Sequence, residues 1–385
     1  MINPSAWRSY GEQAAVIVAA ALDQTPIILS PRLGRHVYLK LETFQPTGSF
    51  KVRGALAALS ILGNSADEFI VASTGNFALG TAWAAGFCCR SATVVVPEIT
   101  SQAKIDALKR LSARLVIHGD SKEAAERYAQ SQAHGSSRYI SAAAEPAVIA
   151  GQGTVGSELL TQLDGSFTVV CGIGSGGLAA GIGLIAAQSG RIRVIGVEAT
   201  QSPAMSTALR MGHVSPITVR STLADGLAGN LTADSLTVNL IQRHVSDVIT
   251  VTESEIAAGI RYLISEHGLV AEGAGAAPLA AVMAGKVSTA EPIVAIITGR
   301  NIARDALARV LLEAGSRALT PKSCWQHYAV SLGPRMRLAC CRDRLEIACP
   351  GCTALTLPTV PAPGKTLRRG PLLTQWPGEV QRALG

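Results

Sequence analysis

Aromatic and charged residues are both scarce in this chain of 385 residues, at 4% and 16% of the composition, while 48% of the residues are hydrophobic. Glycine is common, with 38 residues, but it follows no fixed period, so the composition excludes collagen, a coiled coil and a disordered chain. The length suffices for two or more domains that each bury a core. Together these features favour a soluble α/β protein.

An excess of basic over acidic residues is also absent from most of the chain, because the net charge of +7 lies almost wholly near the C-terminus. Residues 321–385 hold nine lysines and arginines against three acidic residues, whereas residues 1–320 are nearly neutral. Eight of the 18 prolines fall in this basic Pro/Cys-rich tail, which we expect to be poorly ordered. A near-neutral main body gives no electrostatic support for nucleic acid as its partner.

The main body lacks a disulfide framework and a convincing membrane span. Three of the eight cysteines precede the tail, in apolar runs, which indicates a reduced, cytoplasmic chain. The apolar run at residues 14–22 has no basic cluster before it, so it predicts a helix rather than a signal peptide. The uncharged residues 165–190 contain repeated glycines, which suit a strand, a glycine loop and a buried helix better than a membrane helix.

Short apolar runs alternate with alanine-rich helical stretches throughout the main body. This alternation is typical of parallel sheets covered by helices, so we expect an α/β fold. Two glycine-bearing turns that each follow a strand, near residues 73–80 and 172–177, suggest two α/β units facing a cleft. The predicted strands are 37–41, 69–72, 93–96, 114–117, 167–171, 193–197 and 293–297, and the predicted helices include 101–111, 122–130 and 253–266.

One lysine lies where its amine is available for chemistry. Lys51 follows a Pro-Thr-Gly-Ser turn and begins an apolar, alanine-rich helix. A helix N-terminus and apolar neighbours both disfavour the ammonium form, which leaves an amine for a Schiff base or a proton transfer. Taken alone, a turn of this kind more often carries an ordinary solvated lysine.

Two further loops offer backbone donors at helix starts. Residues 73–76 (Ser-Thr-Gly-Asn) could hold a carboxylate, or they could simply cap the next helix. Residues 174–177 (Gly-Ser-Gly-Gly) predict an anion site built from N–H groups and a helix dipole. Together with Gly172 they also match a dinucleotide pattern, and Glu198 follows about 20 residues later. The loop alone therefore leaves open both NAD and a phosphorylated cofactor.

The combination of motifs resembles the fold type II pyridoxal-phosphate (PLP) enzymes, and within them the threonine/serine dehydratase (ammonia-lyase) and serine racemase branch. The resemblance spans residues 24–314 and includes further motifs at 151–156, 224–226, 271–277 and 298–302. It implies a tryptophan synthase β-like fold with two doubly wound parallel-sheet domains around a cleft. The implied large PLP-binding domain comprises residues 1–51 and 143–320, and the implied small domain comprises residues 52–142.

The resemblance also implies roles for individual residues. Lys51 would bind pyridoxal 5'-phosphate as a Schiff base and then move the Cα proton of the substrate. Ser73, Thr74 and Gly75 would receive the carboxylate of a small amino-acid substrate. The remaining cofactor-binding residues would be Phe50, Asn76, Gly174, Ser175, Gly176, Gly177, Gly226, Glu272 and Thr298. Family members usually form homodimers, so we expect a homodimer here.

The position of Thr298 bears on the reaction, because it matches the family residue that meets the pyridine nitrogen. A neutral hydroxyl cannot hold a pyridinium proton as a carboxylate would, so the ring is a weaker electron sink. A carbanion at Cα should then expel a β-hydroxyl promptly. We therefore expect β-elimination of a 3-hydroxy amino acid such as threonine or serine, giving a 2-oxo acid and ammonia.

Several positions depart from the family pattern. Thr74 stands where dehydratases usually have Ala and racemases have Ser, and its hydroxyl could act as the opposite-face acid of a racemase. Phe77 replaces a His, and Arg300 replaces a Gly; Arg300 would favour a second acidic group on the substrate if it faced the cleft, but we expect it to face solvent. Family members that bind a divalent cation use a Glu matching Glu198 and an Asp where this chain has Ala204, so we expect no metal site.

Three alternatives to the dehydratase interpretation follow from these residues. A racemase of the same architecture would differ only in the fate of the Cα carbanion. An NAD-dependent dehydrogenase would account for the glycine loop and Glu198 but would leave Lys51 and Asn76 without a role. A catalytically silent homologue would bind the cofactor or a small ligand, although the retention of Lys51 argues against it.

Overall fold

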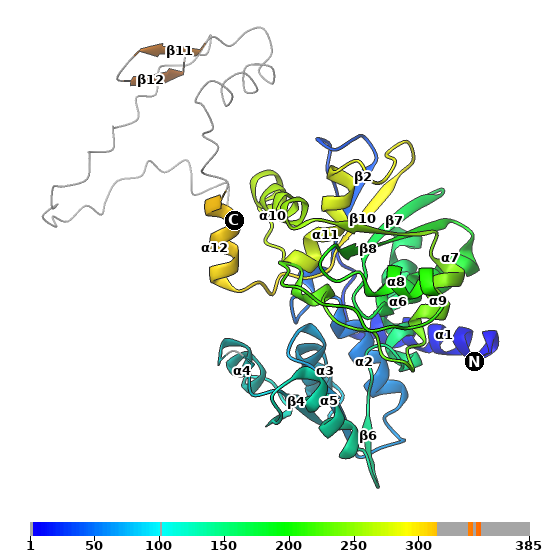
Figure 1. Ribbon diagram of the computed structural model, residues 1–385. Helices are drawn as coiled ribbons and strands as arrows, with labels where there is room; N and C mark the ends of the chain where they lie inside the picture. Colours follow the sequence, from blue (N-terminus) through cyan, green and yellow to red (C-terminus); the bar gives the residue numbers. More distant parts are fainter. Residues whose placement is uncertain (1–2, 101, 314–337, 342–343, 348–385) are drawn as a thin grey trace, which may run out of the picture. The chain divides into compact units, whose positions relative to one another are not determined.

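The computed structural model describes residues 3–100, 102–313, 338–341 and 344–347 (Figure 1). The chain divides into two units, residues 1–314 and residues 315–385. In the second unit the structure describes one antiparallel hairpin, made by β11 (Leu338–Cys341) and β12 (Arg344–Ile347). Apart from this hairpin, the tail 321–385, which the sequence predicts to be poorly ordered, lies outside the described residues.

Two sheets organise the first unit. The larger has six strands in the order β1-β2-β10-β7-β8-β9, and all its neighbours are parallel except β1, which pairs antiparallel with β2. Its strands are β1 (Ile27–Leu29), β2 (Val37–Leu41), β7 (Phe167–Gly172), β8 (Ile192–Ala199), β9 (Asp247–Val251) and β10 (Ile293–Ile297).

The smaller sheet has four parallel strands in the order β5-β4-β3-β6. They are β3 (Glu68–Ala72), β4 (Ser91–Val96), β5 (Arg114–Ile117) and β6 (Ser137–Tyr139). Figure 1 shows this sheet with its helices in blue to teal in the lower part of the view, and the larger sheet above it, with β2 in blue, β7 and β8 in green and β10 in yellow.

Helices cover both faces of each sheet, which explains why the central strands β7 and β10 are almost entirely apolar. On β7, Val170 packs with the residues of α10 and α11, while its neighbour Val169 packs with those of α6 and α7. On the small sheet, Val71 and Val94 pack with α2 and α3, while Ile70 packs with α5. The helices are α1 (Pro4–Ala21), α2 (Lys51–Ile61), α3 (Asn76–Phe87), α4 (Gln102–Lys109), α5 (Lys122–Ser131), α6 (Pro146–Gln162), α7 (Gly177–Ser189), α8 (Ala204–Met211), α9 (Thr237–His244), α10 (Glu253–His267), α11 (Gly273–Met283) and α12 (Arg304–Leu312), with short 3-10 turns η1 (Glu42–Phe44) and η2 (Asp225–Leu227).

The predicted strands and helices are confirmed to within a few residues at their ends. The sequence missed β1, β6 and β9, which lie at edges of their sheets. Such strands are buried on fewer sides than central strands, so their apolar runs are short or interrupted by polar residues. The apolar residues 14–22 fall largely in α1, and none of the helices in the described ranges combines the length and hydropathy of a membrane span.

A close approach of two helix backbones fixes the start of α7. A Cβ atom added to Gly181 would lie 2.4 Å from the carbonyl oxygen of Ile149 and 2.6 Å from the nitrogen of Gly153. Glycine is thus required at Gly153 and Gly181, where α6 and α7 meet, whereas Gly151 lies against α2, with a Cβ there 2.6 Å from the carbonyl oxygen of Arg53. The contact between α6 and α7 holds the loop before α7 in a fixed position.

Candidate active site

The predicted site residues gather at the carboxyl ends of strands from both sheets. The Ser73–Gly75 turn follows β3, the glycine loop 174–177 follows β7, and Thr298 follows β10. Ligands of open α/β sheets bind at this edge, because the loops that leave parallel strands converge there.

Lys51 is the first residue of α2 and is tied to the end of β10. Ser49 forms a bridge with Gly299, and the N–H of Phe50 donates to the carbonyl oxygen of Thr298 at 3.0 Å. The Lys51 Nζ lies 4.9 Å from the centre of the Phe50 ring. Burial lowers the pKa of the Lys51 amine to about 8, and the attraction of the Glu272 carboxylate opposes this shift. The amine is therefore easier to deprotonate than that of an exposed lysine.

A chain of amide hydrogen bonds joins four of the predicted motifs. The Asn76 Nδ2 donates to Glu272 Oε1 at 2.6 Å, and the Asn301 Nδ2 donates to Asn76 Oδ1 at 2.7 Å. The same Asn301 Nδ2 lies 2.9 Å from the carbonyl oxygen of Thr47, in the turn before Lys51. Since an amide nitrogen carries two N–H groups, Asn76 keeps one for a ligand. Asn301 was not among the predicted site residues, although its motif was.

Glu272, which accepts the hydrogen bond from Asn76, is deeply buried. Its Oε1 lies so close to Gly299 that a Cβ there would come within 2.4 Å, and a Cβ on Gly226 would lie 3.9 Å away. Burial raises the pKa of Glu272 to about 7, and repulsion from Asp225 adds to the shift. The carboxyl group therefore changes its charge near neutral pH, beside the amine of Lys51.

We expect Glu272→Gln to change how stability depends on pH. The folded carboxyl titrates at about 7 and the unfolded one at 4.5, so between these values the folded chain binds more protons. Wild-type stability should thus fall by about 3 kcal/mol from this group as the pH rises through that window, and the variant should lose this slope. Urea unfolding of the PLP-free proteins between pH 5 and 8 measures it, with the exposed Glu98→Gln as control. Parallel pH profiles for wild type and Glu272→Gln would contradict the expectation.

The glycine loop before α7 forms a cradle of backbone donors. Gly176 has a φ of 88°, which favours glycine, and a Cβ on Gly174 would lie 2.9 Å from the carbonyl oxygen of Gly226. Within the described part of the chain, no hydrogen-bond acceptor is in place for the N–H groups of residues 174–177. Unpaired N–H groups at a helix start favour an anion such as a phosphate.

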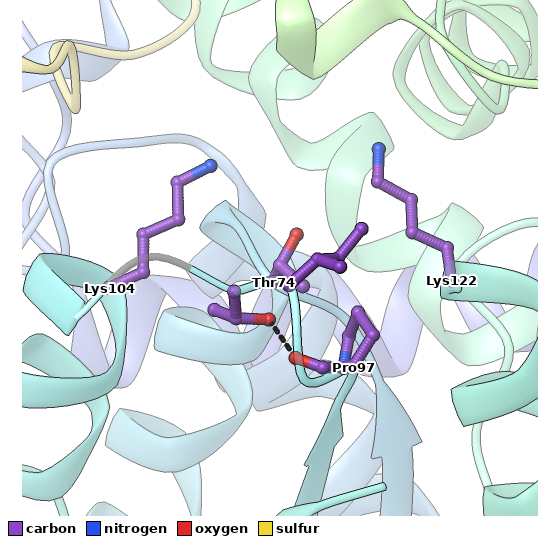
Figure 2. Close-up of a pocket in the computed structure, with 6 residues that line it drawn as sticks. Thr74, Pro97, Lys104 and Lys122 are labelled. Atoms are coloured by element: carbon purple, nitrogen blue, oxygen red, sulfur yellow. Dashed lines mark hydrogen bonds between the residues drawn. The ribbon is translucent and has the colours of Figure 1, made fainter. Parts of the chain in front are cut away.

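The Ser73–Gly75 turn precedes α3, and two of its three N–H groups already have acceptors. The N–H of Gly75 lies 3.3 Å from Ser73 Oγ, and the N–H of Ser73 donates to Val95. Thr74 lines a cavity of about 230 Å³ that opens beside the turn (Figure 2). A Cβ on Gly80 would lie 3.1 Å from the Lys51 carbonyl oxygen, so α3 packs closely against the start of α2.

Arg53, two residues after Lys51 in α2, lies in a largely buried ion network that the sequence analysis did not identify. Arg53 Nε and Nη2 each donate to Glu42 at 2.8 Å, and Arg53 Nη1 donates to Glu158 at 2.6 Å. Lys40 Nζ also donates to Glu158, at 2.6 Å. Burial alone would raise the pKa of Glu42, but the Arg53 guanidinium outweighs it and holds the pKa below its usual value. The network binds α2 to β2, η1 and α6.

The residues that depart from the family pattern have clear positions. Phe77 is buried in the core with Val52, and Arg300 is exposed, as expected. The Arg300 side chain lies over the turn at Gly48. The Glu198 carboxylate accepts hydrogen bonds from the N–H groups of Met205 and Ser206 and from the Ser206 hydroxyl, so it caps the start of α8.

Comparison with known proteins agrees with this arrangement. A family profile described as "Pyridoxal-phosphate dependent enzyme" matches residues 18–299. The chain belongs to this family. It is 35% identical over 288 residues to the L-threonine ammonia-lyase of Thermotoga maritima, covering 74% of this chain and 72% of that protein.

Two solved structures extend the comparison. Processed threonine deaminase isoform 2 from Solanum lycopersicum has a TM-score of 0.75 at 30% identity, covering 82% of this chain and 95% of that one. Maize serine racemase has a TM-score of 0.72 at 25% identity, and the match covers 80% of this chain and 97% of that one. The predicted fold type II class, the dehydratase and racemase branch and the PLP cofactor are thus confirmed. The NAD-dependent dehydrogenase alternative is removed.

The residues present fit PLP. The cradle at residues 174–177 suits a phosphate monoester, because its glycines leave space and its N–H groups are unpaired. Lys51 offers an amine with a lowered pKa. Thr298 is buried, and its carbonyl oxygen accepts from the N–H of Phe50, the residue before Lys51.

Proposed function

We propose that this chain catalyses β-elimination of a 3-hydroxy amino acid, which yields a 2-oxo acid and ammonia. The observation that carries the proposal is the Lys51 amine, whose pKa is lowered to about 8, at the junction of the motifs described above. Its similarity to an L-threonine ammonia-lyase supports the same reaction.

Each residue has a defined task in this proposal. PLP, when bound, supplies a sink for the electrons of the breaking Cα–H bond. Residues 174–177 would hold its phosphate and Asn76 would donate to its ring hydroxyl. Phe50, Gly226, Glu272 and Thr298 would lie beside the ring. Ser73, Thr74 and Gly75 would bind the substrate carboxylate before α3, with the Thr74 N–H and the Ser73 and Thr74 hydroxyl groups as donors. The Lys51 amine accepts the Cα proton, and the hydroxyl leaves from the neighbouring carbon as water.

Release of a 2-oxo acid by the purified, PLP-loaded protein tests the proposal directly. L-Threonine, L-serine and threo-3-hydroxyaspartate are the first substrates to compare, because they differ only at Cβ. Formation of a 2-oxo acid and ammonia in equal amounts supports the elimination. Absence of both products with all three amino acids contradicts it.

A racemase is the second candidate, and Thr74 is the residue that favours it. Its hydroxyl lies in the turn that would bind the substrate carboxylate and at the wall of a cavity, where it could return a proton to the opposite face of Cα. Chiral analysis of serine during the same assay separates the two reactions. Inversion without 2-oxo acid would identify the racemase.

We further propose that residues 1–51 with 143–320 and residues 52–142 are the large and small domains. The two separate sheets support this division.

We also propose a cytoplasmic homodimer. Among the described residues Cys88, Cys89 and Cys171 are free thiols, which supports a reducing compartment. Light scattering of the purified protein tests the dimer.

A further inference from the structure

Three neighbouring strands of the small sheet end side by side and build the cavity at Thr74. Because β3, β4 and β5 are parallel neighbours, the loops that follow them meet at one edge. Thr74 follows β3, Lys104 lies on the helix after β4, and Lys122 begins the helix after β5. The cavity of about 230 Å³ is lined by Thr74, Pro97, Ile99, Thr100, Lys104 and Lys122.

The charge in this cavity is entirely positive. Figure 2 shows the Lys104 and Lys122 side chains on opposite sides of Thr74, and no acidic residue is in the lining. Lys104 Nζ lies 3.5 Å from Asp225 Oδ2, but both side chains are exposed, at 45% and 66%, so this ion pair is weak. Across the described ranges, no carboxylate lies within ion-pair distance of Lys122.

The remaining lining limits what can bind there. The Thr100 hydroxyl already donates to the carbonyl oxygen of Pro97 at 2.6 Å, and Ile99 and Pro97 offer only apolar surface. The cavity is smaller than the roughly 300–1,000 Å³ of sites for drug-sized ligands. A small anionic group therefore fits better than a nucleotide or another large effector.

We infer that Lys104 and Lys122 bind a second carboxylate, carried on the side chain of the substrate. The inference rests on the proposed function, in which the turn at Ser73–Gly75 receives the first carboxylate of the amino acid. The N–H of Thr74 and the hydroxyl groups of Ser73 and Thr74 remain as donors for that first carboxylate. Two ammonium groups beside Thr74 therefore exceed what one carboxylate needs. The preferred substrate is thus a dicarboxylic 3-hydroxy amino acid, such as 3-hydroxyaspartate.

The reaction on such a substrate balances without a co-reactant. The Cα–H bond breaks with its proton going to Lys51, and the Cβ–O bond breaks with the hydroxyl leaving as water. The free enamine tautomerises to an imine, which adds one water and releases ammonia. The water lost equals the water consumed, and the product is a dicarboxylic 2-oxo acid.

The test compares acids that bind but cannot react. Binding of L-malate, L-lactate and inorganic phosphate to the PLP-loaded protein is measured by calorimetry, since malate and lactate differ by one carboxylate. We expect malate to bind about tenfold more tightly than lactate, as two partly exposed charge pairs would give. The preference should vanish in Lys104→Gln/Lys122→Gln, survive in the two Lys→Arg replacements and in the matched control Lys109→Gln, and shrink at high salt.

Turnover supplies the second readout. In wild type we expect kcat/KM for threo-3-hydroxyaspartate to exceed that for L-serine by about tenfold, and the double Gln variant should equalise the two. Equal binding of malate and lactate alongside normal serine turnover overturns the inference and leaves the proposed function intact. Tighter binding of phosphate than of malate also overturns it. Selective malate binding without turnover of any amino acid contradicts the proposed function instead.

Discussion

Replacement of Lys51 by Ala should reduce turnover by about 10⁴-fold or more, because one residue supplies both the covalent link to PLP and the base for the Cα proton. Borohydride reduction followed by peptide mass spectrometry should find PLP attached at Lys51 in the wild type. The variant should carry no attached PLP. The fold should be unaffected, since no described side-chain hydrogen bond depends on the Lys51 amine.

Lys109→Ala is a suitable control for this experiment, because Lys109 is an exposed lysine at the end of α4. It should retain full turnover and the PLP link. Wild-type-like turnover by Lys51→Ala, or attachment of PLP to another lysine, would remove Lys51 from the catalytic role. Added methylamine offers a further check, because an external amine should partly restore the proton transfer.

Arg53→Met should destabilise the protein by about 3–5 kcal/mol, as expected when a buried ion network loses one partner. The variant leaves Glu42 fully buried without the guanidinium that donates to both of its oxygens. Urea unfolding of wild type and variant at pH 7 measures the loss. Turnover should fall too, because α2 begins two residues earlier at Lys51.

Two comparisons show whether the effect comes from the network. Arg114→Met removes an exposed arginine on β5 and should change stability by less than about 0.5 kcal/mol. The double replacement Arg53→Met/Glu42→Gln should recover part of the loss, since it no longer buries an unpaired charge. If Arg53→Met and Arg114→Met were equally stable, the network would have no structural role.

The sequence was most informative where a local pattern carries the signal. Central strands such as β7 and β10 are short apolar runs because helices cover both of their faces, so the pattern itself reveals them. The glycine loop and the turn at Lys51 are contiguous motifs whose chemistry depends on residues adjacent in sequence. Edge strands such as β9 are half exposed and gave no comparable signal.

Some residues of the candidate site could likewise be identified from local motifs, whereas others could be identified only from their contacts in the structure. Lys51, Asn76, Glu272 and Thr298 were identified from motifs, and the structure brings Asn76 and Glu272 within hydrogen-bond distance. The roles assigned to them stay predictions. Asn301 lay in the 298–302 motif but was assigned no role, because its importance lies in the two partners that it joins, Thr47 and Asn76, which are distant in sequence.

By itself the sequence determined the α/β class, the family and the cofactor, since these depend on periodicity and on short motifs. Only the tertiary structure placed Arg53 between Glu42 and Glu158 and set Lys104 and Lys122 on either side of Thr74. A lysine on a helix looks the same in sequence whether it faces solvent or a cavity. Its neighbours come from other strands of the sheet, and strand order, which brings distant residues together, is set by the packing of the whole chain.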